Sequence, residues 1–163
     1  MAGRPRAKSA PTKAKSEVVL PPSLVDHMFA GPRARAVLRG REIAVQDLKD
    51  SGGTYKLAEV QVLLNDVSRQ RVDQMVKAGK LLVLPGSSNS RRYPAVQFNA
   101  DGTLVDGLKD VQDALPTRNP WAVLNFLIHA DDRLQGVRPI DLLRQGKVAA
   151  VVAAAARMAQ LGA

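Results

Sequence analysis

The stretch SRQRVDQMVKAGKLLVLPG, residues 68–86, joins a short amphipathic helix to an apolar strand and decides the fold. Ser68 is a favourable N-cap for a helix over Arg69–Ala78. Gly79 follows at the C′ position, where the left-handed backbone that often ends a helix favours glycine. The pattern predicts an inward stripe of Val72, Met75 and Val76 and an outward face of Arg69, Gln70, Asp73, Gln74 and Lys77.

The sequence on either side of this stretch predicts a helix-turn-helix motif followed by a wing. Residues 57–64, LAEVQVLL, read as a short helix, and residues 65–67, NDV, as a tight turn. After Gly79, LLVLP predicts a strand and GSSNSRR a polar loop, while Pro94 in YPAVQF favours an edge or strand-end position. Two short helices joined by a tight turn, then a two-stranded wing, are typical of a winged helix-turn-helix.

The polar start of the second helix predicts contact with the major groove of DNA. Residues at the N-terminus of a recognition helix reach base edges, where Arg pairs with guanine and Gln with adenine. We therefore expect base contacts from Arg69, Gln70 and Gln74. The rest of the expected DNA-binding set is Ser68, Arg71 (which can also reach a base), Lys77, Lys80, Arg91 and Arg92. The alternative is a small helical hairpin whose arginines only make it soluble.

Positive charge is concentrated in the first hundred residues of the 163-residue chain. These hold 17 Lys and Arg against 8 Asp and Glu, whereas residues 101–163 hold 7 of each kind. The net charge of +9 therefore predicts one part that binds a polyanion and a neutral part with another task. The alternative is a basic protein with no nucleic-acid partner. With 45% apolar residues, the chain can form one ordinary domain or two small ones.

Other features of the composition exclude classes of site and location. The chain has no cysteine, which excludes disulfides and cysteine zinc sites and fits a reducing compartment. No apolar run approaches the roughly 20 residues of a membrane span, and the basic start lacks the apolar segment of a signal peptide. We expect a cytoplasmic, nucleoid-associated protein with no membrane contact.

Two N-terminal segments precede the expected DNA reader. Residues 1–16 hold five basic residues, two prolines and no acid, which predicts a disordered basic tail. Ser23 can cap a short helix, and a longer helix is expected over residues 32–49, ended by Ser51-Gly52-Gly53. This longer helix is a candidate dimerisation surface. Its expected inward positions are Ala34, Val37, Leu38, Ala44, Val45 and Leu48, with Arg33, Arg35, Arg39 and Arg41 on a solvated face.

The neutral part of the chain predicts a small helical domain. Asn119 or Thr117 can cap a helix that carries Trp121. Pro139 suits the first turn of the next helix, which Gly146 ends. Residues 147–161 are alanine-rich and strongly helix-forming. The expected inward stripe of this last helix is Val148, Val151, Val152 and Ala155.

The chain resembles two kinds of bacterial protein. SRQRVDQMVKAGKL is similar to the winged-helix segment of MerR and excisionase DNA-binding domains. Residues 55–163 as a whole resemble the Xre/MbcA/ParS-like antitoxins. Their C-terminal domain has a tryptophan-bearing helix, a leucine-glycine loop, a proline-opened helix ending in glycine, and a final helix. The matching positions are Trp121, Leu134, Gly136, Pro139, Leu142, Leu143, Gly146, Val148 and Val152.

The resemblance implies a DNA-binding antitoxin. In that family the partner is often a RES-domain toxin that consumes NAD, and the complex represses its own operon. We expect the partner surface at Leu134, Gly136, Arg138, Pro139, Met158, Leu161, Gly162 and Ala163. A homodimer bound to an operator in double-stranded DNA is expected, because one small reader rarely gives enough specificity. The alternative is a stand-alone transcription regulator or an architectural DNA-binding protein without a toxin.

Catalytic and metal-binding patterns are missing from the sequence. His27 and His129 lie in apolar helical contexts without metal-ligand spacing, and there is no phosphate loop or nucleophile elbow. Asp131-Asp132 is expected to cap or solvate a turn. We therefore expect no enzyme, no cofactor and no metal. The predicted fold is mainly α, with a tail (1–16), a helical segment (17–53), a winged helix-turn-helix (54–100) and a helical partner-binding domain (101–163).

Overall fold

The structure, a computed structural model, describes residues 31–161 of the chain. Contacts group the chain into two units, Met1–Gly40 and Arg41–Ala163. The expected basic tail, the helix near Ser23, His27 and the last two residues of the expected partner surface lie outside the described residues. The described part is mainly helical, with seven α-helices and a three-stranded antiparallel sheet.

Helix α4 (Arg69–Lys77) begins and ends where its caps predict. The hydroxyl of Ser68 accepts a hydrogen bond from a backbone amide in the first turn at 3.1 Å. Gly79 follows the helix with a φ of +75°, in the left-handed region that favours glycine. The Lys80 amide then donates to the Met75 carbonyl at 2.9 Å, which is the long hydrogen bond of a Schellman motif. Both predicted signals are confirmed.

Helix α3 (Leu57–Leu63) precedes α4 and contacts it across the predicted turn. Val60 is fully buried between the two helices and the sheet. Asn65 and Asp66 take φ values of +63° and +59° in the turn. Asn and Asp tolerate this left-handed backbone better than most residues, so the sequence suits the turn.

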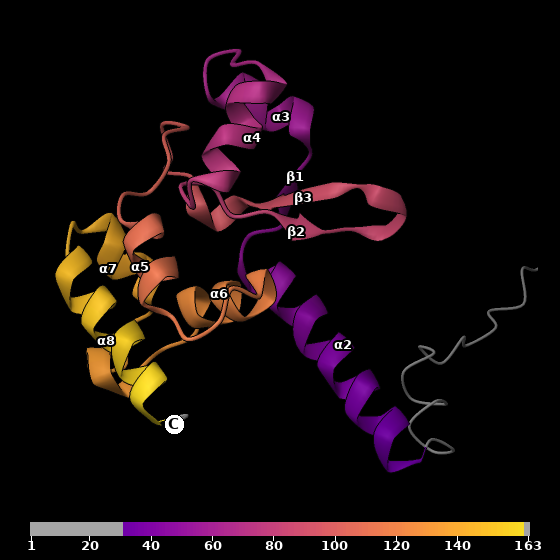
Figure 1. The fold of residues 1–163 in the computed structure, drawn as a ribbon, viewed down its shortest axis with the longest axis vertical. Coiled ribbons are helices and arrows are strands. Elements are labelled where there is room, and N and C mark those ends of the chain that lie inside the picture. Colours follow the sequence, from indigo (N-terminus) through magenta and orange to yellow (C-terminus); the bar gives the residue numbers. More distant parts are fainter. Residues whose placement is uncertain (1–30, 162–163) are drawn as a thin grey trace, which may run out of the picture. The chain divides into compact units, whose positions relative to one another are not determined.

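The hairpin predicted after α4 is present, but its sheet has three strands rather than two. β2 (Leu84–Pro85) and β3 (Arg91–Pro94) pair antiparallel, and β1 (Thr54–Tyr55) pairs with the other edge of β3. Pro94 ends β3, as expected. The β2–β3 hairpin extends to one side of α3 and α4 (Figure 1). The order helix, turn, helix, hairpin is therefore the one the sequence predicts.

The strand predicted over residues 81–85 is shorter than expected, because the Gln97 side chain, rather than another strand, forms hydrogen bonds with the backbone of Leu82. Gln97 is fully buried, and its Oε1 accepts a hydrogen bond from the Leu82 amide at 2.7 Å. Its Nε2 donates to the Leu82 carbonyl at 2.9 Å and to the Pro94 carbonyl at 3.1 Å. Gln97 thus pairs the backbone of Leu82 as a neighbouring strand would.

Two apolar clusters form the core of the unit that begins at Arg41. The smaller cluster lies under α3, α4 and the sheet and contains Val60, Val72, Leu81, Tyr93 and Phe98. The larger cluster fills the helical C-terminal part and also takes in Leu82, Leu84 and Val96. The adjacent residues Leu81 and Leu82 therefore belong to different clusters, and the segment between α4 and β2 connects them.

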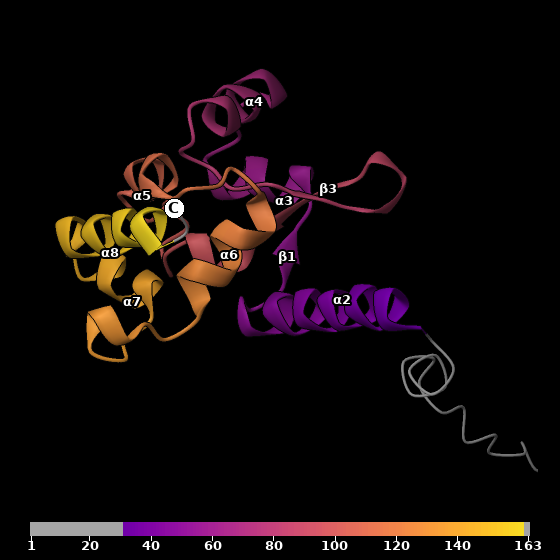
Figure 2. The same ribbon diagram turned by 60° about the horizontal axis from the view of Figure 1, so that its bottom comes forward.

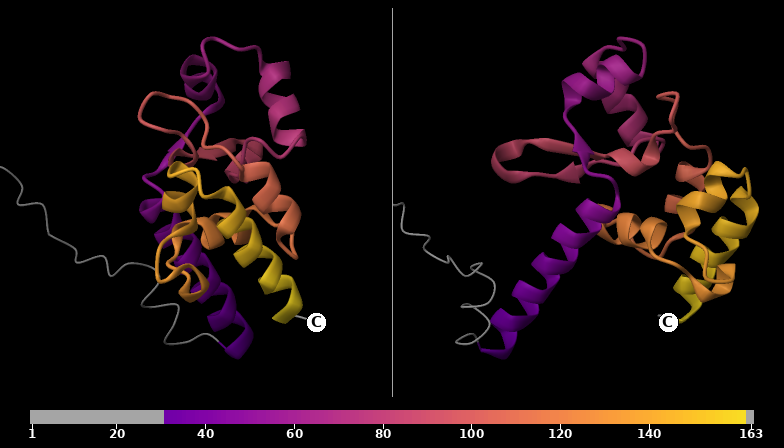
Figure 3. Two further views of the ribbon diagram at one scale, coloured as in Figure 1. Left: turned by 90° about the vertical axis from the view of Figure 1, so that its left-hand side faces the viewer. Right: turned by 180° about the vertical axis from the view of Figure 1, so that it is seen from behind.

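Four helices build the C-terminal part: α5 (Leu108–Ala114), α6 (Pro120–Ile128), α7 (Pro139–Arg144) and α8 (Val148–Leu161). The last three agree with the sequence prediction, including the Asn119 cap on α6 and proline in the first turn of α7. Helix α5 was not predicted. It contacts α8 more extensively than it contacts any other element, and the two lie side by side in Figures 2 and 3.

Helix α2 (Pro32–Asp50) has the predicted length, but its predicted inward stripe is partly wrong. Within the unit that begins at Arg41, Leu48 packs against the larger cluster, whereas Val45 is exposed. The buried residue of the helix is Asp47, whose carboxylate accepts a hydrogen bond from Asn125 Nδ2 at 3.1 Å. A polar contact to α6 therefore fixes this end of α2 where an apolar stripe was expected.

Candidate nucleic-acid interface

A cationic cavity of about 270 Å³ lies between the start of α4, the residues that open α3 and the β2–β3 hairpin. Three of the residues expected to contact DNA line it: Arg69, Arg91 and Arg92. Its full lining is Lys56, Leu57, Arg69, Asn89, Ser90, Arg91 and Arg92. The lining contains four cations and no carboxylate. Asp73, outside the lining, pairs with Arg91, and the other three cations give the cavity a positive field that attracts anions such as a phosphate group.

Lys56 is the cation in this cavity that sequence reasoning missed. In the antiparallel pairing of β1 with β3, Tyr55 lies opposite Tyr93. The next residues along each strand are Lys56 and Arg92, so this register brings the two cations together at the end of the sheet. The only sequence signal was a lysine directly before a predicted helix, and that signal does not reveal a strand pairing.

Arg91 differs from its neighbours because it has an acidic partner on α4. Its guanidinium forms a hydrogen-bonded ion pair with Asp73. This hydrogen bond raises the pKa of Arg91 above its ordinary value. The pair connects the hairpin to α4 across 18 residues of sequence. Arg91 therefore positions the hairpin, and a phosphate would have to compete with Asp73 for it.

The exposed face of α4 carries the expected base-reading residues. Arg69, Gln70 and Gln74 are exposed, while Val72 on the opposite side is fully buried. Arg71 is also exposed, and its Nη1 lies 3.5 Å from Gln74 Oε1. Since the apolar side of α4 fixes the helix on the core, this polar face is directed away from the core.

The remaining expected contacts fall into two groups. Ser68 caps α4, so its hydroxyl is already engaged with the backbone. Lys77 and Lys80 are exposed at the far end of α4. Lys77 lies about 12 Å along the helix from Arg69 at 1.5 Å per residue. Lys77 lines a second cavity, next to α5, rather than the cationic one.

The expected partner surface is only partly accessible. Leu134 and Pro139 are buried in the helical core, so their side chains do not face a partner. Met158 is half-buried against the same core. Residues that pack in a core and residues that bind a partner are both apolar, so the sequence did not show that Leu134 and Pro139 are buried.

Three residues of that expected surface do reach the exterior. Gly136 is exposed in a turn with a φ of +74°. Arg138 is half-exposed, and its guanidinium binds Asp141 at 2.7 and 3.0 Å. Leu161, in the last described turn of α8, is 77% exposed. An apolar side chain at this exposure is available to a partner.

The structure also shows the surroundings of the acidic pair and of His129, both of which were considered in the sequence. Asp131 caps a short turn, as expected, and its carboxylate accepts a hydrogen bond from the Arg133 amide at 2.8 Å. His129 Nε2 lies 3.5 Å from an oxygen of Asp47. Residues 31–161 contain no group of three or more His, Asp or Glu side chains placed to hold a metal ion. In the same range, none of the helices combines the length and the apolar character needed to cross a membrane.

Comparison of the chain with protein-family models, with curated proteins and with solved structures found no match. The similarity to antitoxins described from the sequence therefore stays a prediction. A functional assignment therefore rests on the geometry of α4, the β2–β3 hairpin and the cationic cavity.

Proposed function

We propose that the chain is a DNA-binding protein whose α4 reads base edges while the adjacent cationic cavity holds the phosphate backbone. The observation that carries this proposal is the cavity itself. It places Lys56 and Arg92 beside Arg69, at the start of the exposed polar face of α4, and no carboxylate lines it. A phosphate held there would fix the orientation of α4 on a duplex, because phosphate contacts position a protein and base contacts specify the sequence.

The order of elements supports a winged helix-turn-helix interpretation of this surface. In that arrangement the second helix enters the major groove with its N-terminal residues foremost, and the wing lies along the backbone. Arg69 and Gln70 occupy that leading position on α4, and Arg92 lies on the hairpin. Arg has the geometry to bind guanine bidentately, and Gln to bind adenine.

Base reading and backbone binding are expected to respond differently to substitution. Arg69→Ala should weaken binding to the preferred sequence by about 1–3 kcal/mol and relax specificity at one position. Lys80→Ala should weaken binding to all sequences alike and lower the slope of log K against log salt by about one. Fluorescence anisotropy on duplexes selected from a random pool, at several salt concentrations, measures both effects.

The matched control for both substitutions is Arg157→Ala. Arg157 is an exposed cation on α8, away from the cationic cavity. Its removal changes the net charge by the same amount and should leave the sequence preference unchanged. Equal losses for Arg69→Ala and Lys80→Ala on every duplex would contradict the assignment of separate roles.

Asp73→Asn is expected to strengthen DNA binding without changing its sequence preference. The substitution removes a negative charge from the DNA-facing surface and releases Arg91 for a phosphate. One added phosphate contact should make the salt slope steeper by about one. A salt titration of the variant against the wild type measures this slope. Weaker binding at every salt concentration would show that the link from hairpin to α4 matters more than the released charge.

The antitoxin role is the part of the proposal that depends on sequence resemblance. The resemblance implies a toxin partner, and the exposed Leu161 at the end of α8 offers an apolar contact. Co-purification from the source organism at high salt with nuclease tests this role. A stoichiometric protein that is toxic when expressed alone would support it. Recovery of specific DNA with no protein partner would instead leave a stand-alone regulator.

A further inference from the structure

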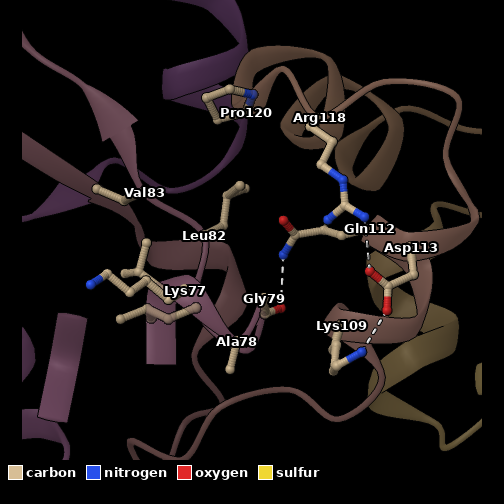
Figure 4. Close-up of a pocket in the computed structure, with 12 residues that line it drawn as sticks. Lys77, Ala78, Gly79, Leu82, Val83, Lys109, Gln112, Asp113, Arg118 and Pro120 are labelled. Atoms are coloured by element: carbon tan, nitrogen blue, oxygen red, sulfur yellow. Dashed lines mark hydrogen bonds and ion pairs between the residues drawn. The ribbon is translucent and has the colours of Figure 1, made fainter. Parts of the chain in front are cut away.

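A second cavity, of about 400 Å³, lies between the C-terminal end of α4 and helix α5. Ligand pockets in proteins commonly measure about 300–1,000 Å³, so the volume suits a small organic molecule. The wall is built from the end of α4, the segment that leads into β2, helix α5 and the residues around the start of α6 (Figure 4). None of the expected DNA-binding residues except Lys77 lines it.

The cavity combines an apolar base with a charged rim. The apolar surface that faces the cavity comes from the partly exposed Val76, Val83 and Pro120, with the almost fully buried Leu81 and Leu82 behind them. This base offers contact to an apolar ring or chain. An apolar body on a ligand therefore complements this base, and the rim sets the charge that the cavity favours.

The rim carries three cations and one carboxylate. Asp113 accepts a hydrogen bond from Lys109 Nζ at 2.6 Å and has Arg118 Nη2 at 3.5 Å. The hydrogen bond lowers the pKa of Asp113 and raises that of Lys109, so both stay charged near neutral pH. Lys77 is the third cation. The single carboxylate leaves the rim positive, and Arg118, whose side chain is 82% exposed, can reorient toward an anion.

The cavity touches the cap that ends α4. Gln112 Nε2 donates a hydrogen bond to the Gly79 carbonyl at 2.9 Å, and Figure 4 shows this bond at the edge of the cavity. An added Cβ at Gly79 would lie 3.5 Å from Lys109 Cγ, so α4 and α5 approach closely here. A molecule that contacts Gln112 therefore also acts on the end of α4.

We propose that this cavity binds a small organic anion with an apolar body, such as an aromatic carboxylate or sulfonate. A second claim rests on the proposed DNA-binding function: occupancy of the cavity changes the affinity for DNA through the Gln112–Gly79 contact. Coupling of this kind is reciprocal, so DNA must change the affinity for the anion by the same factor.

The probe for the test is 1-anilinonaphthalene-8-sulfonate, with N-phenyl-1-naphthylamine as its uncharged counterpart. Fluorescence titration of the full chain gives the affinity for each. Substituting both Lys109 and Arg118 by Gln should weaken sulfonate binding about tenfold, as expected from two partly exposed cations. Asp113→Asn should tighten it about twofold. The uncharged probe should bind all variants with the same affinity, and Arg157→Gln should change the affinity for neither probe.

A folding defect exposes apolar surface and raises the binding of both probes. The tightening expected for Asp113→Asn is therefore specific to the sulfonate, with the uncharged probe and the circular dichroism spectrum unchanged. Amide NMR spectra locate the probe, with shifts expected at Gly79, Val83 and the Gln112 side chain. Unchanged sulfonate affinity in the double variant, or shifts confined to other regions, would overturn the site. Unchanged DNA affinity at saturating probe would overturn the coupling alone. A chain that binds no DNA would refute the proposed function and leave the fluorescence result intact.

Discussion

Replacement of Gln97 by leucine is expected to lower the free energy of unfolding by about 3–4 kcal/mol, because each buried polar group left unpaired costs about 1–3 kcal/mol. The Gln97 side chain makes three hydrogen bonds to the backbone, two to Leu82 and one to Pro94. Leucine has a similar size but cannot make any of them. Leu82 lies in the segment that connects the two core clusters, so both clusters should loosen together.

Urea unfolding followed by circular dichroism measures this change. Gln145→Leu is the matched control, because Gln145 is exposed and makes the same chemical exchange at the surface. Substitutions of that kind usually change stability by no more than about 0.5 kcal/mol. A loss below about 1 kcal/mol for Gln97→Leu would show that water replaces the missing amide, contrary to the burial seen here.

Gly107→Ala is expected to destabilise the chain by about 3 kcal/mol, combining backbone strain with overpacking. Gly107 precedes α5 with a φ of +86°, a conformation that favours glycine. An added Cβ would lie 2.6 Å from Val148 Cγ1 and 3.3 Å from a methyl of Leu143. The close contact between α5 and α8 therefore requires glycine at this position for two separate reasons.

Gly146→Ala separates the two reasons. Gly146 has a φ of +78°, but an added Cβ there would meet nothing within 4 Å. Thermal and urea unfolding should show that this control lowers the free energy of unfolding by about 1 kcal/mol, from strain alone. Val148→Ala should also recover part of the loss in Gly107→Ala by removing the methyl groups that clash. Equal losses for the two glycine substitutions would mean that the α5–α8 contact gives way without cost.

The parts of the fold that the sequence predicts correctly depend on short-range signals. Ser68 acts on a backbone amide three residues away, and Gly79 closes hydrogen bonds within one turn of α4. Asn119 caps α6 in the same way, through the Trp121 amide. Such caps need only neighbouring residues, so they are visible in one sequence.

The parts that were missed depend on pairing between distant residues. β1 is two residues long, and only its register with Tyr93 makes it a strand and brings Lys56 to the cationic cavity. Helix α5 is seven residues long and follows Gly107 without a side-chain cap. Its apolar spacing, with Leu108 and Val111 both buried, was the signal available in the sequence.

The candidate site divides in the same way, into features that neighbouring residues predict and contacts between distant residues that they do not. The exposed polar face of α4 was predictable from helical periodicity, because Val72 and its apolar neighbours define the opposite side. The ion pair of Arg91 with Asp73 was not, because it joins residues 18 apart on different elements. The burial of Leu134 was also missed, because the sequence pattern cannot separate a residue that packs from one that binds.

The measurement that tests the central claim most directly compares three proteins on the same duplexes: the full chain, the chain lacking residues 1–16, and Arg69→Ala. Each is titrated against a duplex selected from a random pool and against a scrambled version of it. We expect the truncation to weaken binding to both duplexes alike, since it removes five cations and no base-reading residue. Arg69→Ala should instead reduce the preference for the selected duplex. Loss of all binding on truncation, with Arg69→Ala unchanged, would contradict the claim that α4 reads DNA.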